Sequence, residues 1–141
     1  MQRKASAAWE GGLKDGEGTV STESGVLDKS PYSFGTRFES AKGTNPEELL
    51  GAAHAGCFSM ALSLILGEAG IKPERIDTRA TVSLEKQEPG FAVTKVHLDV
   101  TVRAPGADRR KFEEAAGKAK AGCPISKVLK AEITMDAKLA A

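Results

Sequence analysis

Polar and apolar residues alternate over short segments near both ends of the chain, and apolar residues merge into one long run in the middle. In the N-terminal part, glycine-rich turns separate segments whose alternation predicts strands over 5–10, 18–24 and 33–39. In the third of these, Phe34 and Phe38 fall on one face and Arg37 on the other. The first third of the chain is therefore predicted to be a β-meander.

The middle of the chain predicts a long helix. Residues 45–48 (Asn-Pro-Glu-Glu) offer an N-cap, a proline at the first helical position and two acids in the first turn. Residues 49–66 are apolar on nearly every side, which predicts a helix that is buried all round. These 18 residues also satisfy the length of a membrane span. Polar and small residues interrupt the run, so we expect a core helix and no membrane: Gly51, His54, Gly56, Ser59 and Ser63.

The last third of the chain alternates again and then shows helical periodicity. Strands are predicted over 75–85, 91–102 and 133–139, and an amphipathic helix over 108–121. Apolar positions in the second of these strands change from odd to even numbers, which predicts a β-bulge near Thr94 or Lys95. The fold class is therefore α+β, and the chain length predicts a single domain over 1–141.

Charge and composition narrow the possible functions. Lys and Arg number 20 against 19 for Asp and Glu, so the net charge is +1 and no basic block predicts a nucleic-acid partner. Two Cys and two His are too few for a zinc ribbon, and we expect no bound metal. The first 30 residues contain no apolar segment typical of a signal peptide, so a cytoplasmic location is expected. Because so short a chain struggles to bury an all-apolar helix, we expect a homodimer in which two such helices pack centrally and the sheets wrap outside.

Two cysteines are the main candidates for chemistry. Cys57 lies inside the apolar run and is either an inert core residue or a reactive thiol. Cys123 precedes Pro124 and is predicted to be the N-cap of a short helix, where the pKa of a thiol falls; alternatively it only ends the preceding helix. A third possibility is that the two form a redox pair.

Other polar residues allow both structural and functional interpretations. Arg37 is either a solvated strand charge or a site residue, and Glu47 either a first-turn acid or a partner for a cation. His54 is either a base or a buried structural histidine, and His97 lies on the polar face of a strand with no expected role.

Four segments carry a resemblance to a known family. They are GTVSTESGVL (18–27), PYSFGTRFE (31–39), GTNPEELLGAAHAGCFSMALS (43–63) and KAKAGCPISKVLKAEI (118–133). Together they resemble the OsmC/Ohr family of thiol-dependent peroxidases, and the similarity extends from Trp9 to Leu139. Ohr-type members carry Tyr where this chain has His54, so the chain is similar to the OsmC branch.

The resemblance implies an active site. Cys57 matches the peroxidatic cysteine of the family, Cys123 the resolving cysteine, Arg37 an arginine of the N-terminal part, and Glu47 a glutamate ten residues before the peroxidatic cysteine. It also implies an intertwined α+β dimer, two central apolar helices wrapped by antiparallel sheets, with active sites at the subunit interface.

The implied reaction is the reduction of organic hydroperoxides, with hydrogen peroxide as a further substrate of some members. No cofactor is expected, and an external dithiol or lipoyl-type reductant is the implied partner, because Ohr-type members are recycled by lipoyl groups. Two alternatives from other classes use the same Cys57 and Cys123: a non-catalytic redox sensor and a carrier of apolar ligands.

The spacing of Glu47 and Cys57 leads to one geometric expectation. Ten residues on a straight α-helix rise about 15 Å, so the two side chains cannot share one guanidinium on an unbroken helix. We therefore predict a break near Gly51, with the long helix beginning at about Ala52.

Overall fold

The computed structural model describes residues 1–140 and divides the chain into two units. Unit 1 is Met1–Leu49, and unit 2 begins at Leu50. Each unit is described by itself, and the expectation of a single domain over 1–141 stays a prediction.

Unit 1 contains a three-stranded antiparallel sheet, whose first two strands confirm those predicted over 5–10 and 18–24. Its strands are β1 (Ala5–Glu10), β2 (Glu17–Thr22) and β3 (Ser30–Tyr32), which pair in that order. Gly18 of β2 lies opposite both Trp9 and Tyr32, whose rings pack with centroids 5.4 Å apart. A Cβ on Gly18 would come within 2.6 Å of Trp9 and 2.7 Å of Tyr32, so glycine is required for this aromatic contact.

The strand predicted over 33–39 is wrong, because this segment forms the helix α1 (Phe34–Phe38). Ser33 caps it: its hydroxyl accepts a hydrogen bond from the Thr36 N–H, and the Thr36 hydroxyl accepts one from the Ser33 N–H. This reciprocal capping box satisfies N–H groups of the first turn and overrides the weak alternation of the aromatic residues. Phe34 and Phe38 are four residues apart on this helix, and their rings lie 5.0 Å apart.

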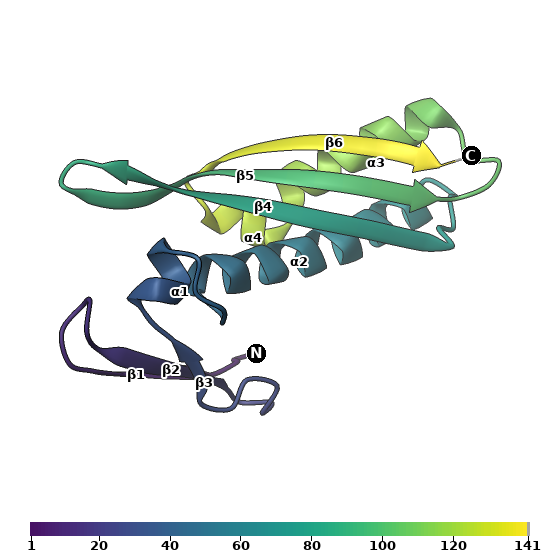
Figure 1. Ribbon diagram of the computed structural model, residues 1–141. Coiled ribbons are helices and arrows are strands. Elements are labelled where there is room, and N and C mark those ends of the chain that lie inside the picture. The colour runs from purple at the N-terminus through teal and green to yellow at the C-terminus, as the bar shows by residue number, and fades with distance from the viewer. Residues whose placement is uncertain (141) are drawn as a thin grey trace. The chain divides into compact units, whose positions relative to one another are not determined.

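Unit 2 contains most of α2 (Pro46–Glu68) and a second three-stranded sheet. Its further elements are β4 (Arg75–Gln87), β5 (Gly90–Arg103), α3 (Arg109–Gly122), α4 (Pro124–Val128) and β6 (Glu132–Ala140), with strand order β4-β5-β6 (Figure 1). β4 and β5 are antiparallel, whereas β6 runs parallel to β5. The expectation of purely antiparallel sheets is therefore wrong at this pair. The reason is that α3 and α4 form a crossover connection, which returns the chain in the same direction.

The predicted β-bulge is confirmed in the hairpin of β4 and β5. Ser83 pairs with Lys95 and Leu84 with Val93, so Thr94 is the extra residue on β5. The insertion lets Val93 and Val96, on either side of it, both face the core of the sheet.

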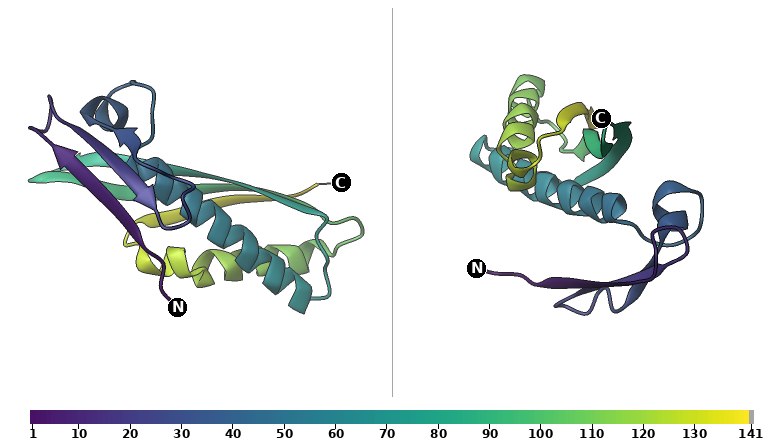
Figure 2. Two further views of the ribbon diagram at one scale, coloured as in Figure 1. Left: turned by 90° about the horizontal axis from the view of Figure 1, so that it is seen from below. Right: turned by 90° about the vertical axis from the view of Figure 1, so that its left-hand side faces the viewer.

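The core of unit 2 lies between this sheet and two helices. The even-numbered residues Val96, Leu98, Val100 and Val102 of β5 are buried. α2 and α3 lie side by side against this face (Figure 2). The helical residues of the core are Phe58, Leu62 and Leu66 of α2, with Phe112, Ala115, Ala116 and Ala119 of α3. The amphipathic helix predicted over 108–121 is thereby confirmed.

The predicted helix break near Gly51 is wrong. α2 runs without interruption from Pro46 to Glu68, and the predicted N-cap at its start is confirmed by the Glu48 N–H, which donates to Asn45 Oδ1 at 2.8 Å. Gly51 is buried instead, and a Cβ there would lie 3.3 Å from Val82 Cγ2. The missing side chain allows close packing of α2 on β4 rather than a change of direction.

Burial of α2 is one-sided within a single chain. The helix buries one stripe, whereas Met60 and Leu64 are 78% and 65% exposed. The expectation that the helix is buried all round is therefore not met by one copy of the chain. By length and composition α2 would also be able to cross a membrane, although its buried stripe belongs to the core of unit 2.

Candidate functional site

Two thiols that are 66 residues apart in the sequence meet in unit 2. Cys57 lies in the middle of α2, and Cys123 lies at the corner where α3 ends and α4 begins. Their Sγ atoms are 2.9 Å apart and share a hydrogen bond, and both cysteines are free. Cys57 is partly exposed, whereas Cys123 is fully buried.

The surroundings shift the pKa values of the two thiols in opposite directions. Burial raises the pKa of Cys57, and the hydrogen bond with Cys123 raises it further. Burial also acts to raise the pKa of Cys123, but hydrogen bonding from Cys57, Ser126 and the Ile125 N–H outweighs it, so this pKa is lowered. The low pKa expected for Cys123 is therefore confirmed. In one chain, Cys57 keeps its proton and Cys123 more readily carries the charge.

Cys123 stands at the N-cap position of α4, as predicted, and Pro124 occupies the first turn. Its thiol makes no close capping hydrogen bond. The N–H groups of Ile125 and Ser126 and the Ser126 hydroxyl nevertheless lower the pKa of Cys123.

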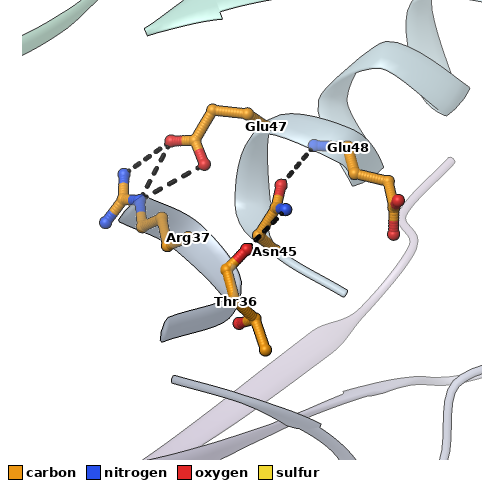
Figure 3. A network of polar contacts seen from close by, with 5 residues as sticks. All are labelled: Thr36, Arg37, Asn45, Glu47 and Glu48. Atoms are coloured by element: carbon orange, nitrogen blue, oxygen red, sulfur yellow. Dashed lines mark hydrogen bonds and ion pairs between the residues drawn. The ribbon is translucent and has the colours of Figure 1, made fainter. Parts of the chain in front are cut away.

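Arg37 and Glu47 form an ion pair in unit 1 (Figure 3). Arg37 Nε donates to both carboxylate oxygens of Glu47, at 3.0 and 3.2 Å, and Arg37 Nη2 donates to Glu47 Oε1 at 2.7 Å. Asn45 connects the start of α2 to α1, because its Nδ2 donates to the carbonyl oxygen of Thr36 at 3.0 Å. The neighbouring acid Glu48 turns away and accepts from the Thr44 hydroxyl. The guanidinium therefore pairs with Glu47 and not with Glu48.

The ion pair borders an aromatic pocket of about 270 Å³. Phe34 and Phe38 line it together with Arg37, whose guanidinium lies 5.2 Å from the centre of the Phe38 ring. The other lining residues are Trp9, Leu13, Tyr32 and Ser33. The prediction that Arg37 faces away from the two phenylalanines is therefore wrong, because α1 replaces the expected strand.

His54 and Ser126 form a second buried contact beside the thiols. His54 Nε2 lies 2.8 Å from Ser126 Oγ, and both residues are buried. Sequence reasoning considered His54 but missed Ser126. Its position three residues after the N-cap Cys123, where capping-box partners stand, was the available signal.

One group of side chains in residues 1–140 is close enough to share a metal ion: His97, Asp99 and Asp136. The two carboxylates lie 3.4 and 3.2 Å from His97 Nε2, and the His97 Nδ1 contacts the Thr134 hydroxyl. Both carboxylates are largely exposed, and the geometry is that of ordinary surface ion pairs.

The distance between the thiols leads to a prediction about oxidation. Addition of one equivalent of a thiol oxidant to the reduced protein should convert Cys57 and Cys123 to an intrachain disulfide, because the sulfur atoms need to approach by less than 1 Å. Intact mass should fall by two hydrogens, and non-reducing electrophoresis should show a faster monomer band. Cys57→Ser and Cys123→Ser are the controls without this band. A chain that instead cross-links to a second chain would contradict the described geometry.

Comparison with known proteins places the chain in a family. Residues 39–138 match the model of the family described as OsmC-like protein. The chain is 63% identical over 139 residues to Peroxiredoxin OsmC of Escherichia coli (strain K12), a match that covers 99% of this chain and 97% of that protein. The crystal structure of the organic hydroperoxide resistance protein OhrB of Bacillus subtilis matches with a TM-score of 0.68 and 27% identity, over 97% of this chain and 98% of that one. An OsmC-like protein of unknown function from Vibrio cholerae shares the fold, with a TM-score of 0.76 at 20% identity over 97% of this chain and 99% of that one. The chain belongs to the OsmC-like protein family.

Proposed function

We propose that this protein is a thiol-dependent peroxidase that reduces organic hydroperoxides, with Cys57 as the peroxidatic and Cys123 as the resolving cysteine. The class of activity follows from the family and from 63% identity over nearly the whole chain to a peroxiredoxin. The organic hydroperoxide resistance proteins among the relatives support the class of substrate.

The observation that carries the assignment of roles is the unequal exposure of two thiols in contact. A peroxide must reach the attacking sulfur, and only Cys57 of the pair is partly exposed, whereas Cys123 is fully buried at 2.9 Å behind it. The thiolate of Cys57 attacks the O–O bond, which releases an alkoxide that takes a proton and leaves a sulfenic acid on Cys57. Cys123 then displaces the hydroxyl group as water and forms the disulfide.

The first step needs a cation, because burial and Cys123 raise the pKa of Cys57. We propose that Arg37 supplies it, with Glu47 orienting the guanidinium through the bidentate pair. Glu47 and Cys57 are ten residues apart on the unbroken α2 and are therefore separated by about 15 Å. Because Glu47 holds Arg37, this separation favours an arrangement in which Arg37 of a second copy of the chain acts on Cys57. The aromatic pocket beside Arg37 is suited to the alkyl group of the substrate. Phe58 of α2 is a core residue and does not line this pocket.

The electrons of the reaction come from the two thiols, so the proposal requires no resident cofactor but an external dithiol, or a lipoyl-type group, to reduce the disulfide. A cytoplasmic location agrees with this requirement, because thiol reductants are maintained there.

The exposed side of α2 leads us to propose an obligate homodimer. Met60 and Leu64 would lose their exposure if two copies of α2 packed together. Sedimentation over a wide concentration range should therefore detect dimers and no folded monomer, and Leu64→Glu should dissociate or unfold the protein. Val26→Glu, at an exposed loop position in unit 1, is the control that should leave the dimer unchanged. A folded, active monomer at nanomolar concentration, or a monomer that binds lipid vesicles, would contradict the dimer.

The roles of the two cysteines are separated by single substitutions. Cys57→Ser should abolish peroxide consumption, because no accessible thiol remains. Cys123→Ser should reduce one equivalent of cumene hydroperoxide and stop with a sulfenic acid on Cys57, which dimedone and mass spectrometry would detect. The opposite pattern would reverse the assignment. Wild-type oxidation no faster than that of a free thiol would favour a redox sensor or a ligand carrier.

The role of Arg37 is tested by the pH dependence of peroxide consumption. In Arg37→Met no guanidinium opposes the raised pKa of Cys57, so the fraction of Cys57 present as thiolate at neutral pH is lower than in the wild type. At pH values below that pKa, this fraction increases tenfold with each pH unit. We expect stopped-flow rates to be lower by about a hundredfold or more at pH 7 and to rise with pH more steeply than in the wild type. Arg103→Met removes an arginine that is ion-paired with Glu74 and is the matched control. Equal loss at every pH would show that Arg37 does not act on ionisation.

A further inference from the structure

A buried polar pair runs beside the two thiols. His54 and Cys57 lie one turn apart on α2, and Ser126 and Cys123 lie one turn apart at the start of α4. The contact of His54 Nε2 with Ser126 Oγ, at 2.8 Å, therefore lies about one helical turn from the contact between the sulfur atoms, at 2.9 Å. Ser126 also contributes to the low pKa of Cys123 through its N–H and its hydroxyl. Ser126 is the third residue of the helix that Cys123 begins as N-cap, a position from which a side chain reaches back toward the N-cap residue, so the pair is connected to one thiol of the site.

Burial of the His54 imidazole is unfavourable for stability, which points to a functional reason for the residue. His54 has no exposed surface, and its Nδ1 is the one fully buried side-chain nitrogen or oxygen in residues 1–140 without a hydrogen-bond partner. A buried polar group that is only partly satisfied is less favourable than an apolar side chain of similar shape. This feature separates His54 from an ordinary core residue.

The surroundings also indicate which nitrogen of His54 carries the proton. Burial lowers the pKa of His54, so the imidazole is neutral at neutral pH and has one N–H group. A proton on Nδ1 would leave a buried N–H without an acceptor, which is rare in proteins. With the proton on Nε2, His54 donates to Ser126 Oγ. The Ser126 hydroxyl then keeps its own hydrogen free for the sulfur of Cys123.

We propose that His54 and Ser126 are positioning residues of the resolving step. The neutral imidazole holds the Ser126 hydroxyl so that it donates to the Cys123 sulfur and stabilises its thiolate. That thiolate attacks the sulfenic sulfur of Cys57: an S–S bond forms, the S–O bond breaks, and the hydroxide leaves as water with the proton that Cys123 released. The sulfenic sulfur is reduced and the Cys123 sulfur is oxidised, so no further reactant is needed. The proposal rests on the peroxidase function and adds the device that activates its second thiol.

The ionisation of Cys123 is set by few groups. Cys57 faces it directly, and His54 faces it through Ser126, both from α2. β5 and β6 present apolar side chains to this core. Lys120 of α3 and Lys127 of α4 are not among the causes of the shift in the pKa of Cys123. A change in the pH dependence of Cys123 can therefore be traced to these contacts.

The test separates the two chemical steps in a single turnover. Reduced protein is mixed with one equivalent of cumene hydroperoxide, and peroxide loss and disulfide formation are each followed against pH. Ser126→Ala and His54→Gln should leave peroxide loss unchanged and slow disulfide formation about tenfold at pH 7, since one hydrogen bond to a charged atom is lost or misdirected. The rate should recover at high pH, where Cys123 ionises without help. Ser126→Thr, which keeps a hydroxyl, should restore the rate.

The controls keep this proposal distinct from the proposed function. Ser59→Ala removes a hydroxyl of α2 that contacts Thr78 and should change neither step. Unchanged disulfide formation in Ser126→Ala, or equal slowing at every pH, would overturn the positioning role. Failure of the wild type in the first step would instead overturn the peroxidase.

A second measurement needs no turnover. In a Cys57→Ala background, the pH dependence of Cys123 alkylation should shift upward by about one unit on adding Ser126→Ala. An unshifted profile would overturn the proposal, even where the variants fail to turn over.

Discussion

The proposed chemistry of this protein depends on one contact, between the middle of α2 and the corner where α3 meets α4. There the sulfur atoms of Cys57 and Cys123 lie 2.9 Å apart. The contact is maintained by the packing of one α2 stripe on the sheet, where Gly51 allows close approach to β4 and Phe58 fills the core. Because close-packed side chains resist displacement, the two thiols are held ready for disulfide formation.

The two thiols require opposite conditions in the two steps of the proposed reaction. The first step needs charge on Cys57, whose pKa is raised by burial, and the second needs charge on Cys123, whose pKa is lowered by its hydrogen bonds. The structure of unit 2 therefore favours the second step and not the first. We therefore propose a different activating group for each thiol. The ion-paired guanidinium of Arg37 activates Cys57. The Ser126 hydroxyl, held by the His54 imidazole, activates Cys123.

The mispredicted strand over 33–39 and the mispredicted helix break near Gly51 have different physical causes. Residues 33–39 alternate weakly, but the capping box of Ser33 and Thr36 is a local interaction that a period-two pattern does not reveal. Gly51 was interpreted as a weak point of a helix, whereas its packing against Val82 depends on a strand that comes thirty residues later. By contrast, the β-bulge at Thr94 was predictable, because a change of register leaves a trace in the apolar positions themselves.

The amino-acid sequence by itself determined most elements of the fold, the low pKa expected for Cys123 and, through resemblance, the candidate residues Cys57, Cys123, Arg37 and Glu47. These properties can be predicted because periodicity, capping signals and motifs depend only on residues that are close together in the sequence. Only the tertiary structure decided which thiol is buried and that Ser126 meets His54 across 72 residues. Burial and contacts between distant segments arise from the packing of whole elements, and no single segment carries that information.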